Sequence, residues 1–581
     1  MTSFATKAAA AALALSLAAC GRTGADAPGD AADAASATGE APRPGAYFIF
    51  GGPIYPDAKS AAVEAVLVED GRIAGFGARA DLAEAARGAA MVDLQGGALF
   101  PGFVDGHVHL IGVGLRELTL NLEGVASVAA LVDAVAGAVA ETPDGAAVTG
   151  RGWIETGWPE ERFPTRADID PASPDNPVIL YRADGHALLA NSAALERASV
   201  DAGTQSPDGG RIETDADGAP TGLLVDAAMS LVAGLVERPD AARRAEAYAV
   251  ASDVYASRGW TGVHNMSVAP DDLSLIEDAA AAGDVAIRVY NAIDPAGLDD
   301  LIETGPRAAA NGRVVTRAVK MYVDGALGSR GAALEAPYAD APEQRGLLLI
   351  DEAAAKAAYE KALRGGVQIA THAIGDRGNR LVLDWYEDVF AATPVSERAV
   401  ADPRWRIEHA QIVRPADFPR FAELGVMASM QPSHAIGDLF FAPARLGSDR
   451  LDGAYAWRSL LDADAVIVGG SDAPVERGDP LIEFYAAVAR RSLDGFSTDD
   501  WRPDEAVTRA EALAMFTSAP AFAAFEEAAL GDIAVGKRAD LSGFSVDLMT
   551  APLDAIPQGA AVFTMVDGAV VHGEDLVAGA P

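Results

Sequence analysis

Residues 96–110 read GGALFPGFVDGHVHL, in which two glycines precede an apolar run that ends in polar residues. The run at residues 99–104 is typical of a buried β strand that begins after a turn. Because side chains alternate along a strand, His107 and His109 are expected to point to the same side. They could bind one metal ion, or they could be a hydrogen-bonded pair in the core. Only eight histidines occur in the 581 residues, and this stretch favours the metal.

Seven more apolar runs follow, and stretches with helical spacing of Leu, Ala and Phe separate them. Eight strands that alternate with helices predict an α/β protein built on a (β/α)8 TIM-like barrel, which needs about 250 residues. The expected strands are residues 99–109, 261–265, 286–292, 318–323, 367–372, 404–409, 426–430 and 465–470.

The segments on either side of the barrel pattern are rich in short β runs. Residues 46–97 and 525–581 each contain an Asp-Gly step of the hairpin type. Neither segment is large enough to be stable alone, so we expect them to combine into one small composite β-sandwich. The barrel then occupies residues 98–524. It contains a large insertion at about 112–258, because one helix cannot fill the gap between its first two strands.

The first 20 residues, MTSFATKAAAAALALSLAAC, have the organisation of a secretory signal peptide. Lys7 precedes an apolar stretch at residues 8–19, which is shorter than the roughly 20 residues of a mature membrane span. The stretch ends in Leu-Ala-Ala-Cys, which resembles a bacterial lipoprotein cleavage box. We therefore expect residues 1–20 to be a lipoprotein signal peptide. An ordinary signal peptide with an incidental cysteine is the alternative.

Cys20 is the only cysteine of the chain, which excludes disulfides, cysteine nucleophiles and cysteine-rich zinc sites from the mature protein. Residues 21–45 lack large apolar side chains and are expected to be a flexible linker. We expect an exported protein, lipid-anchored at Cys20 on the periplasmic face of a bacterial membrane.

The formal net charge of −39 argues against nucleic acid and anionic membrane surfaces as partners. The expected partner is a small-molecule substrate. Contact with the membrane is expected only through the lipid on Cys20. The protein could also form a homo-oligomer.

Residues that bind metals or carry charge recur at the ends of the expected barrel strands. Active sites of such barrels lie at the C-terminal ends of the strands, so these side chains should meet at one face. Imidazoles and a carboxylate suit zinc and neighbouring divalent ions. Taken singly, each of these residues could be a buried core residue with its hydrogen bonds made. Together they predict a site for one or two metal ions, and we expect the metal to be zinc. The candidate ligands are His107, His109, Lys320, His372, His409 and Asp472.

Lys320 is the unusual member of this set, because an ammonium group repels a metal ion. It could be a structural lysine, a partner for the substrate, or a lysine carboxylated by CO2 that bridges two metal ions about 3.5–4 Å apart. A water shared by such ions is acidic enough to be a nucleophile near neutral pH. Asp472 is then expected to be both a ligand and the catalytic general base, which passes the proton of the water to the leaving amine.

Six motifs occur in a fixed order along the chain: PGFVDGHVHL, VKMYVDGALGSRGA, THAIGDRGN, IEHAQ, MQPSHA and GSDAPVE. Their order resembles the amidohydrolase superfamily, and more narrowly its amidohydrolase-3, YtcJ-like branch. GKRADL is also similar to the C-terminal β segment of that superfamily. The resemblance extends from about residue 46 to the C-terminus.

The resemblance implies a metal-dependent hydrolase of carbon–nitrogen bonds other than peptide bonds, with a barrel and a composite β-sandwich. It implies the same ligand set, and Lys320 matches a lysine that is carboxylated in many members. His434 in MQPSHA and His186 in RADGHALLANSAAL match residues expected to bind the substrate. For both, a structural hydrogen-bonding role stays open. His264 and His572 are expected to be structural.

The leading interpretation is a metal-dependent amidohydrolase that cleaves an amide, N-acyl or N-formyl bond of a small molecule with a metal-activated hydroxide. The same site could instead act on an ester, a lactone or a deaminated ring, because hydroxide attacks all of them. A third interpretation is a non-catalytic binding lipoprotein. The presence of Asp472 and of all four histidine ligands argues against it.

We predict that Cys20→Ser releases the protein from membranes, because the thiol that would carry the lipid is lost. Fractionation of expressing cells checks this, with Ser36→Ala in the linker as the control. Membrane association equal to that of the wild type would contradict lipidation.

Overall fold

The computed structural model describes residues 43–578, apart from residues 156, 184, 186, 208, 209 and 237. The predictions for the signal peptide, for Cys20 and for His186 therefore lie outside the described residues. Within the described part of the chain, no helix is both long and apolar enough to cross a membrane.

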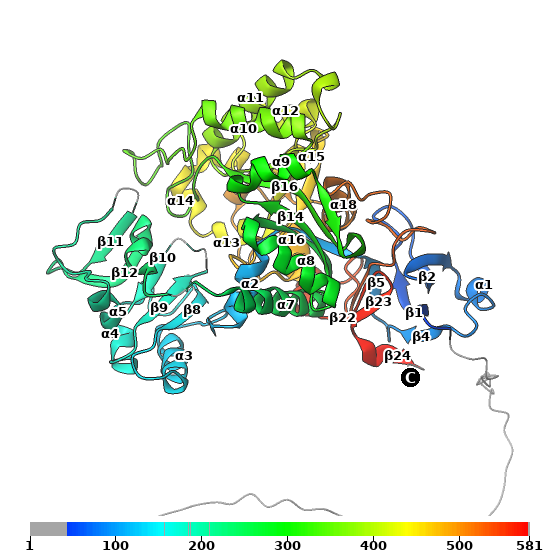
Figure 1. Ribbon diagram of the computed structural model, residues 1–581, viewed down its shortest axis with the longest axis horizontal. Coiled ribbons are helices and arrows are strands. Elements are labelled where there is room, and N and C mark those ends of the chain that lie inside the picture. The colour runs from blue at the N-terminus through cyan, green and yellow to red at the C-terminus, as the bar shows by residue number, and fades with distance from the viewer. Residues whose placement is uncertain are drawn as a thin grey trace, which may run out of the picture. The chain divides into compact units, whose positions relative to one another are not determined.

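Eight parallel strands form a nearly closed barrel (Figure 1). Neighbours in the sheet are also successive strands of the chain, which is the arrangement of a (β/α)8 barrel and confirms the predicted fold class. In the order of the sheet the strands are β6 (Phe103–Val108), β13 (Trp260–Val268), β14 (Arg288–Ile293), β16 (Val314–Tyr322), β17 (Gln368–Ala373), β18 (Arg406–His409), β19 (Met427–Met430) and β20 (Ile467–Gly469). A short strand, β15 (Arg307–Ala309), pairs antiparallel with β16.

The barrel closes where the end of β6 meets the segment that follows β20. Asp472 N donates a hydrogen bond to His107 O at 2.7 Å, and His109 N donates to Ala473 O at 2.8 Å. Gly106 permits this approach, because a Cβ atom there would lie 2.5 Å from the carbonyl oxygen of Gly469. We call this junction the closing seam.

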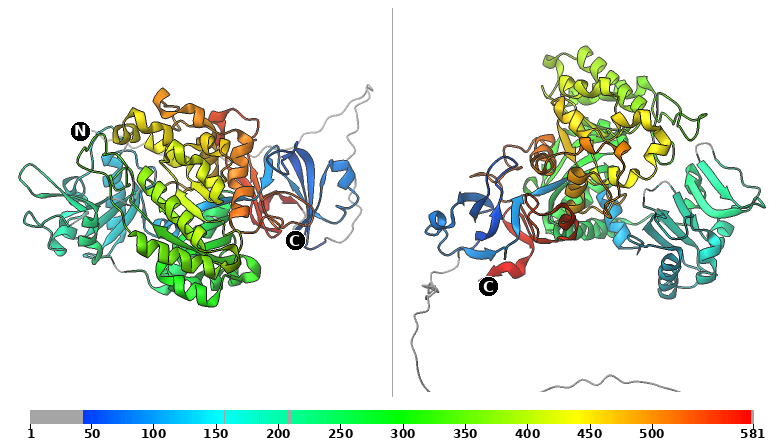
Figure 2. Two further views of the ribbon diagram at one scale, coloured as in Figure 1. Left: turned by 90° about the horizontal axis from the view of Figure 1, so that it is seen from above. Right: turned by 180° about the vertical axis from the view of Figure 1, so that it is seen from behind.

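Helices follow the barrel strands, and local sequence sets their ends (Figures 1 and 2). In α10 (Glu352–Gly365), the Asp351 side chain accepts a hydrogen bond from Ala354 N, and Gly366 ends the helix with a φ of 72°. The other helices of the barrel are α2 (Leu110–Glu117), α7 (Ala241–Ser257), α8 (Leu273–Ala282), α9 (Leu298–Thr304), α11 (Asp376–Ala392), α12 (Phe418–Leu424), α13 (Pro432–Asp438), α14 (Ala442–Leu446), α15 (Trp457–Asp462), α16 (Pro480–Ala489), α17 (Arg509–Phe516) and α18 (Ser518–Ala523).

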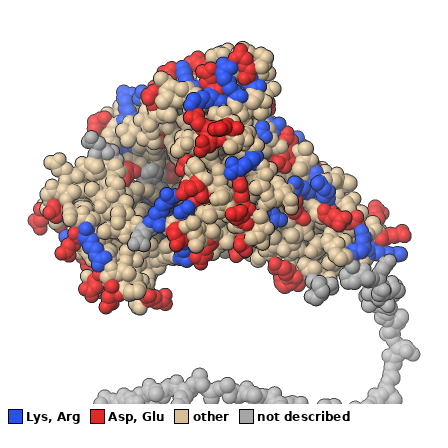
Figure 3. Space-filling view, in the orientation of Figure 1, with Lys and Arg blue, Asp and Glu red and all other residues tan. Residues whose placement is uncertain are grey.

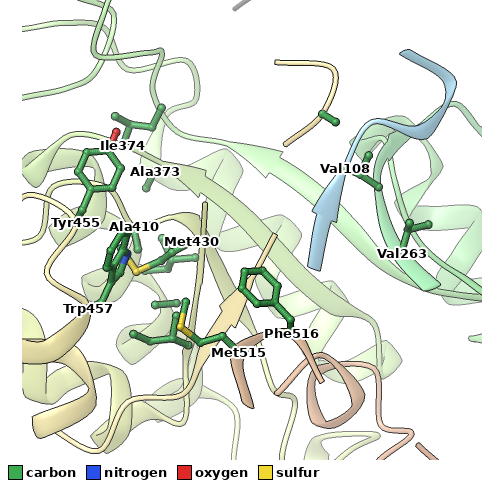
Figure 4. Packing of buried hydrophobic residues seen from close by; sticks show 14 of the residues in the cluster. Val108, Val263, Ala373, Ile374, Ala410, Met430, Tyr455, Trp457, Met515 and Phe516 are labelled. Atoms are coloured by element: carbon green, nitrogen blue, oxygen red, sulfur yellow. The ribbon is translucent and has the colours of Figure 1, made fainter. Parts of the chain in front are cut away.

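The largest hydrophobic core joins the barrel strands to these helices. Figure 4 shows Val108 and Val263 on neighbouring strands, with Phe516 of α17 nearby. Parallel strands that are covered on both faces usually carry continuous apolar runs. β18 departs from this rule, because Arg406 and Glu408 are both 0% exposed.

The two ends of the chain form one nine-stranded β sheet. Its strands are β1 (Ala46–Ile54), β2 (Val63–Glu69), β3 (Arg72–Gly77), β4 (Ala90–Asp93), β5 (Ala98–Pro101), β21 (Leu541–Phe544), β22 (Ala561–Val566), β23 (Ala569–His572) and β24 (Val577–Ala578). The short helix α1 (Arg79–Leu82) lies between β3 and β4. β21 pairs antiparallel with β5, so segments from opposite ends of the chain lie side by side (Figure 2). The sheet branches at β1, which pairs with β2, β4 and β5.

Residues 99–109 are not one strand, in contrast to the prediction. The first part is β5 in the composite sheet, and the second part is β6 in the barrel. The change of sheet falls at Pro101 and Gly102. Pro101 has no N–H to donate to a neighbouring strand, and Gly102 N donates to Asp540 O at 2.8 Å. After these residues the chain passes from the composite sheet into the barrel. His109 lies beyond the strand, at the N-cap position of α2.

A six-stranded sheet of its own lies between α2 and α7 in the chain. Ile179 and Leu180 belong to two separate hydrophobic clusters, because side chains alternate between the faces of this sheet. α2 and α7 pack against each other, so the ends of the expected insertion at 112–258 belong to the barrel. The elements are β7 (Leu120–Asn121), β8 (Val148–Trp153), β9 (Val178–Arg182), β10 (Ala187–Ala190), β11 (Gly210–Thr214), β12 (Pro220–Asp226), α3 (Val128–Glu141), α4 (Arg166–Ile169), α5 (Ser192–Arg197) and α6 (Ser230–Ala233).

Surface charges are distributed rather than collected in one patch on the face shown in Figure 3. Many of them form exposed ion pairs, such as Lys361 Nζ with Asp299 Oδ1 at 2.8 Å. Exposed pairs contribute little to stability, with a median of about 0–1 kcal/mol.

A buried ion-pair network joins the barrel to the composite sheet. The Arg288 guanidinium, at the start of β14, donates to Asp540 Oδ2 at 2.5 Å and to Asp540 Oδ1 at 2.9 Å. It also donates to Asp567 Oδ1, at 2.5 Å. Asp540 precedes β21, and Asp567 lies between β22 and β23. Removal of Arg288 would therefore leave the buried Asp540 carboxylate without a cation, whereas Asp567 would keep its ion pair with Arg538 at 2.8 Å.

We predict that Arg288→Met lowers the free energy of unfolding by about 3–5 kcal/mol, because it breaks a buried pair by removing one partner. Urea unfolding followed by circular dichroism measures this change. Lys361→Met, in an exposed pair, is the matched control and should unfold like the wild type. An Arg288→Met protein as stable as the control would refute the role of this network.

Candidate metal centre

Asp472 lies at the centre of the candidate site, on the closing seam. Its Oδ1 atom is 3.4 Å from His107 Nε2 and 3.3 Å from His109 Nε2. Both histidines come from the end of β6, on the other side of the seam. The three residues form a group whose possible ligand atoms all lie within 4.8 Å of one another.

A second group of the same kind shares Asp472 and contains His409 and His434. His434 is in α13, and its Nε2 atom lies 3.7 Å from Asp472 Oδ2. The ring of His372, near the end of β17, has its centroid 4.5 Å from that of His409. Oδ1 of Asp472 thus lies close to His107 and His109, whereas Oδ2 lies close to His434.

Lys320, in β16, lies against the first group, with its Nζ atom 3.2 Å from His107 Nε2. The residue is 1% exposed. Among the described residues, Lys356, Lys361 and Lys537 form ion pairs, and Lys320 does not. Burial lowers the pKa of Lys320 to about 8, although Glu408 and Asp472 act in the opposite direction. The structure therefore brings all six candidate ligands together.

Several atoms of this site lack a hydrogen-bond partner, which fits a bound metal ion, although His372 Nε2 lies 3.5 Å from the buried Asp324 Oδ1. His372 Nε2, His434 Nε2 and Asp472 Oδ1 are buried and have no hydrogen-bond partner. Buried polar atoms nearly always have one, so these atoms are suited to a bound ligand. Burial lowers the pKa of His372, His409 and His434, and burial together with Lys320 lowers that of His107 to about 3. These lowered pKa values favour the neutral imidazole in these four residues, which is the form that binds a metal ion.

Two of the candidate ligands have a strained backbone. The φ angle is 70° at His409 and 58° at Asp472. Residues other than glycine rarely adopt this left-handed conformation, which costs on the order of 1–3 kcal/mol. At Asp472 the hydrogen bond from its N–H to His107 O helps to impose the conformation. Strain of this kind collects at functional sites.

Two of the histidines have a hydrogen-bond acceptor at their Nδ1 atom. Neither acceptor was predicted from the sequence. Glu408 Oε2 lies 2.5 Å from His107 Nδ1. Gln431 Oε1 lies 2.8 Å from His409 Nδ1. Each contact occupies the Nδ1 atom of its ring and leaves Nε2 available.

The sequence held a signal for Glu408. Arg406 and Glu408 alternate within a strand that was expected to be buried, so their side chains point to the same side. Two charges on one face of a buried strand indicate an internal ion pair. Gln431 lies in the MQPSHA motif, and no spacing distinguished it from its neighbours.

A buried carboxylate also holds the closing seam. Asp105 Oδ1 accepts hydrogen bonds from His107 N at 3.1 Å and from Ser471 N at 2.9 Å. Asp105 Oδ2 accepts from Ser471 Oγ at 2.5 Å and from Tyr255 OH at 3.0 Å. The residues next to Asp472 are thus fixed relative to His107.

The remaining histidines are His186, His264 and His572. The role of His186 stays a prediction, since this residue lies outside the described residues. His264 is 2% exposed, and its Nδ1 atom lies 2.7 Å from an Arg406 nitrogen. His572 is in β23, with its Nε2 atom 3.4 Å from Ala561 O.

Known proteins resemble this chain over most of its length. A model of the amidohydrolase family matches residues 90–572. YtcJ of Bacillus subtilis (strain 168) is 34% identical over 495 residues, which cover 83% of this chain and 91% of YtcJ. The N-substituted formamide deformylase of Arthrobacter pascens is 30% identical over 532 residues, which cover 88% of this chain and 95% of the deformylase.

Solved structures agree with these matches. An uncharacterized metal-dependent hydrolase from Pyrococcus horikoshii OT3 has a TM-score of 0.70 and 25% identity, over 87% of this chain and 99% of that chain. Another from Pyrococcus furiosus has a TM-score of 0.68 and 28% identity, over 87% of this chain and 100% of that chain. The family model spans all six candidate ligands. The chain belongs to the amidohydrolase family.

Proposed function

We propose that this amidohydrolase cleaves a carbon–nitrogen bond other than a peptide bond, in a small molecule of the amide, N-acyl or N-formyl type. The observation that carries the proposal is Asp472, whose carboxylate lies between two groups of imidazoles. Support for the bond type comes from the N-substituted formamide deformylase, which is 30% identical over 95% of its own length.

The candidate ligands hold one or two divalent ions, and the proposed metal is zinc, which suits a set of imidazoles and carboxylates. A bound ion supplies a polarised substrate carbonyl and a water acidic enough to lose a proton near neutral pH. Burial lowers the pKa of His372 and of His409, which favours their neutral form. The proposed ligands are His107, His109, Lys320, His372, His409 and Asp472.

Asp472 transfers the proton in this proposal. One of its carboxylate oxygens accepts a proton from water as the water oxygen bonds to the carbonyl carbon. The resulting carboxylic acid then gives that proton to the leaving nitrogen as the C–N bond breaks. The products are a carboxylic acid and an amine, and Asp472 returns to its ionised form.

His434 contacts the substrate in this proposal. Its Nε2 atom has no hydrogen-bond partner, and it lies 3.7 Å from Asp472 Oδ2 and 3.9 Å from Glu476 Oε1. A group beside the proposed base can hydrogen-bond the substrate at the reacting bond. The same group of atoms also suits a metal ion, which is the alternative role for His434.

Lys320 is carboxylated in the active protein in this proposal. The ammonium group first loses a proton to solvent. The neutral Nζ atom then attacks the carbon of CO2, an N–C bond forms as one C=O π bond opens, and a second proton leaves to solvent. The resulting carbamate is an anion in place of an ammonium group. Support comes from the burial of Lys320 and from its contact with His107 Nε2 at 3.2 Å.

Export and lipid anchoring at Cys20 remain part of the proposal. Their support is the sequence of residues 1–20 alone. The enzyme would then meet a small-molecule substrate on the periplasmic side of the membrane.

We predict that Asp472→Asn lowers kcat by about 10²–10⁴-fold, because an amide cannot accept the proton of water. Much of the metal should stay bound, since the four histidines remain. Turnover of N-substituted formamides and metal content by mass spectrometry check the two parts. Asp133→Asn, at an exposed position of α3, is the matched control. Activity equal to that control would remove Asp472 from the role of base.

We predict that Lys320→Ala loses bound metal and activity together, whereas Lys356→Ala, at a surface ion pair, keeps both. Bicarbonate with a short carboxylate should restore part of the activity, since it replaces the missing anion. Carbon-13 NMR after growth with labelled bicarbonate should show a carbamate signal that Lys320→Ala lacks. A Lys320→Ala protein that binds metal and turns over like the wild type would exclude the bridging role.

A further inference from the structure

Glu408 is a fully buried carboxylate that lies behind the candidate ligand His107. Its Oε2 atom lies 2.5 Å from His107 Nδ1, and both side chains are 0% exposed. The other ring nitrogen, His107 Nε2, faces Lys320 Nζ at 3.2 Å and Asp472 Oδ1 at 3.4 Å. The two nitrogens of this ring therefore have different surroundings, with a carboxylate behind and the candidate metal centre in front.

Arg406 binds both carboxylate oxygens of Glu408. Its Nε atom donates to Glu408 Oε1 at 2.7 Å, and a terminal nitrogen donates to Glu408 Oε2 at 2.9 Å. Oε2 thus receives one bond from Arg406 and one contact from His107. A carboxylate that is bound on both oxygens by a guanidinium acts only as an acceptor toward His107.

Arg406 is itself fixed by three other strands of the barrel. It donates to Gly106 O in β6 at 2.6 Å and to Ser429 Oγ in β19 at 2.7 Å. It also contacts His264 Nδ1 in β13 at 2.7 Å. Glu408 therefore has a single position, set by the barrel and not by a flexible side chain.

We propose that Glu408 is the positioning residue for His107, which keeps the imidazole proton on Nδ1 and so directs the free lone pair of Nε2 into the candidate metal centre. This inference rests on the proposed metal-dependent function. An acceptor on one ring nitrogen fixes the tautomer and the orientation of the ring, and it makes the other nitrogen a better ligand. Loss of such a partner typically weakens metal binding about 10–100-fold.

The contrast between two histidines of the site supports a role beyond packing. His409 uses a neutral amide, Gln431 Oε1, to hold its Nδ1 atom at 2.8 Å. His107 uses a carboxylate, Glu408, to hold its Nδ1 atom instead. The opposite nitrogen of the same ring, Nε2, contacts Lys320. A buried carboxylate and guanidinium are costly to place in a barrel interior, and apolar residues would fill the same space at lower cost.

Glu408→Gln is the direct test, because it gives His107 the same kind of acceptor as His409. The Zn²⁺ affinity of the apoprotein is measured by competition with a chromogenic chelator. We expect the dissociation constant for Zn²⁺ to rise about 10–100-fold. Glu505→Gln is the matched control, since Glu505 is 2% exposed and accepts hydrogen bonds from Ser459, away from the candidate ligands.

A second measurement is made on the wild-type protein itself. Long-range ¹H–¹⁵N correlation spectra of the wild-type apoprotein report which ring nitrogen of His107 carries the proton, with His107→Asn to assign the signal. We expect the proton on Nδ1 in the wild type and a mixture of tautomers in Glu408→Gln. Circular dichroism compares the fold of the variants.

The outcomes separate this inference from the proposed function. A His107 proton on Nε2 in the wild type, or a folded Glu408→Gln protein with the Zn²⁺ affinity of the control, would overturn the positioning role alone. A wild-type protein that binds no Zn²⁺ would overturn the proposed function, and the inference with it.

Discussion

The closing seam of the barrel is the constraint on which the candidate site depends. Two backbone hydrogen bonds, from Asp472 N to His107 O and from His109 N to Ala473 O, join the first barrel strand to the segment after the eighth. The same residues carry the side chains that approach one another at 3.3–3.4 Å. Gly106 leaves room for this contact. The ligand group therefore exists only when the barrel has closed, which couples metal binding to folding.

Polar groups behind the ligands make the site rigid. Asp105 ties the backbone on both sides of the seam, while Arg406 and Glu408 connect four strands around His107. Burial of charges is costly unless every member of the network is paired, and here the guanidinium and both carboxylates have several partners. The interior of the barrel is thus a scaffold that fixes the angles of the imidazoles as well as a hydrophobic core. Glu408 is the member of this scaffold that contacts a candidate ligand directly.

The sequence predicted the parts that follow from periodicity. Eight apolar runs indicated the barrel. Because active sites of such barrels lie at the ends of the strands, the sequence also predicted that His372, His409 and Asp472 lie at one face. The division of residues 99–109 between two sheets escaped prediction, because both halves are equally apolar and only Pro101 and its neighbour mark the change. The partner of His409, Gln431, depends on side-chain directions in three dimensions, which one sequence does not contain. His186 lies outside the described residues and stays a prediction.

Crystallography of the purified protein with anomalous scattering at the zinc edge can locate a metal ion at the candidate centre. We expect an anomalous peak about 2.0–2.2 Å from His107 Nε2, His109 Nε2 and an oxygen of Asp472, because these are the usual bond lengths for zinc. Protein saturated with zinc that shows no peak between these three side chains would contradict their assignment as metal ligands.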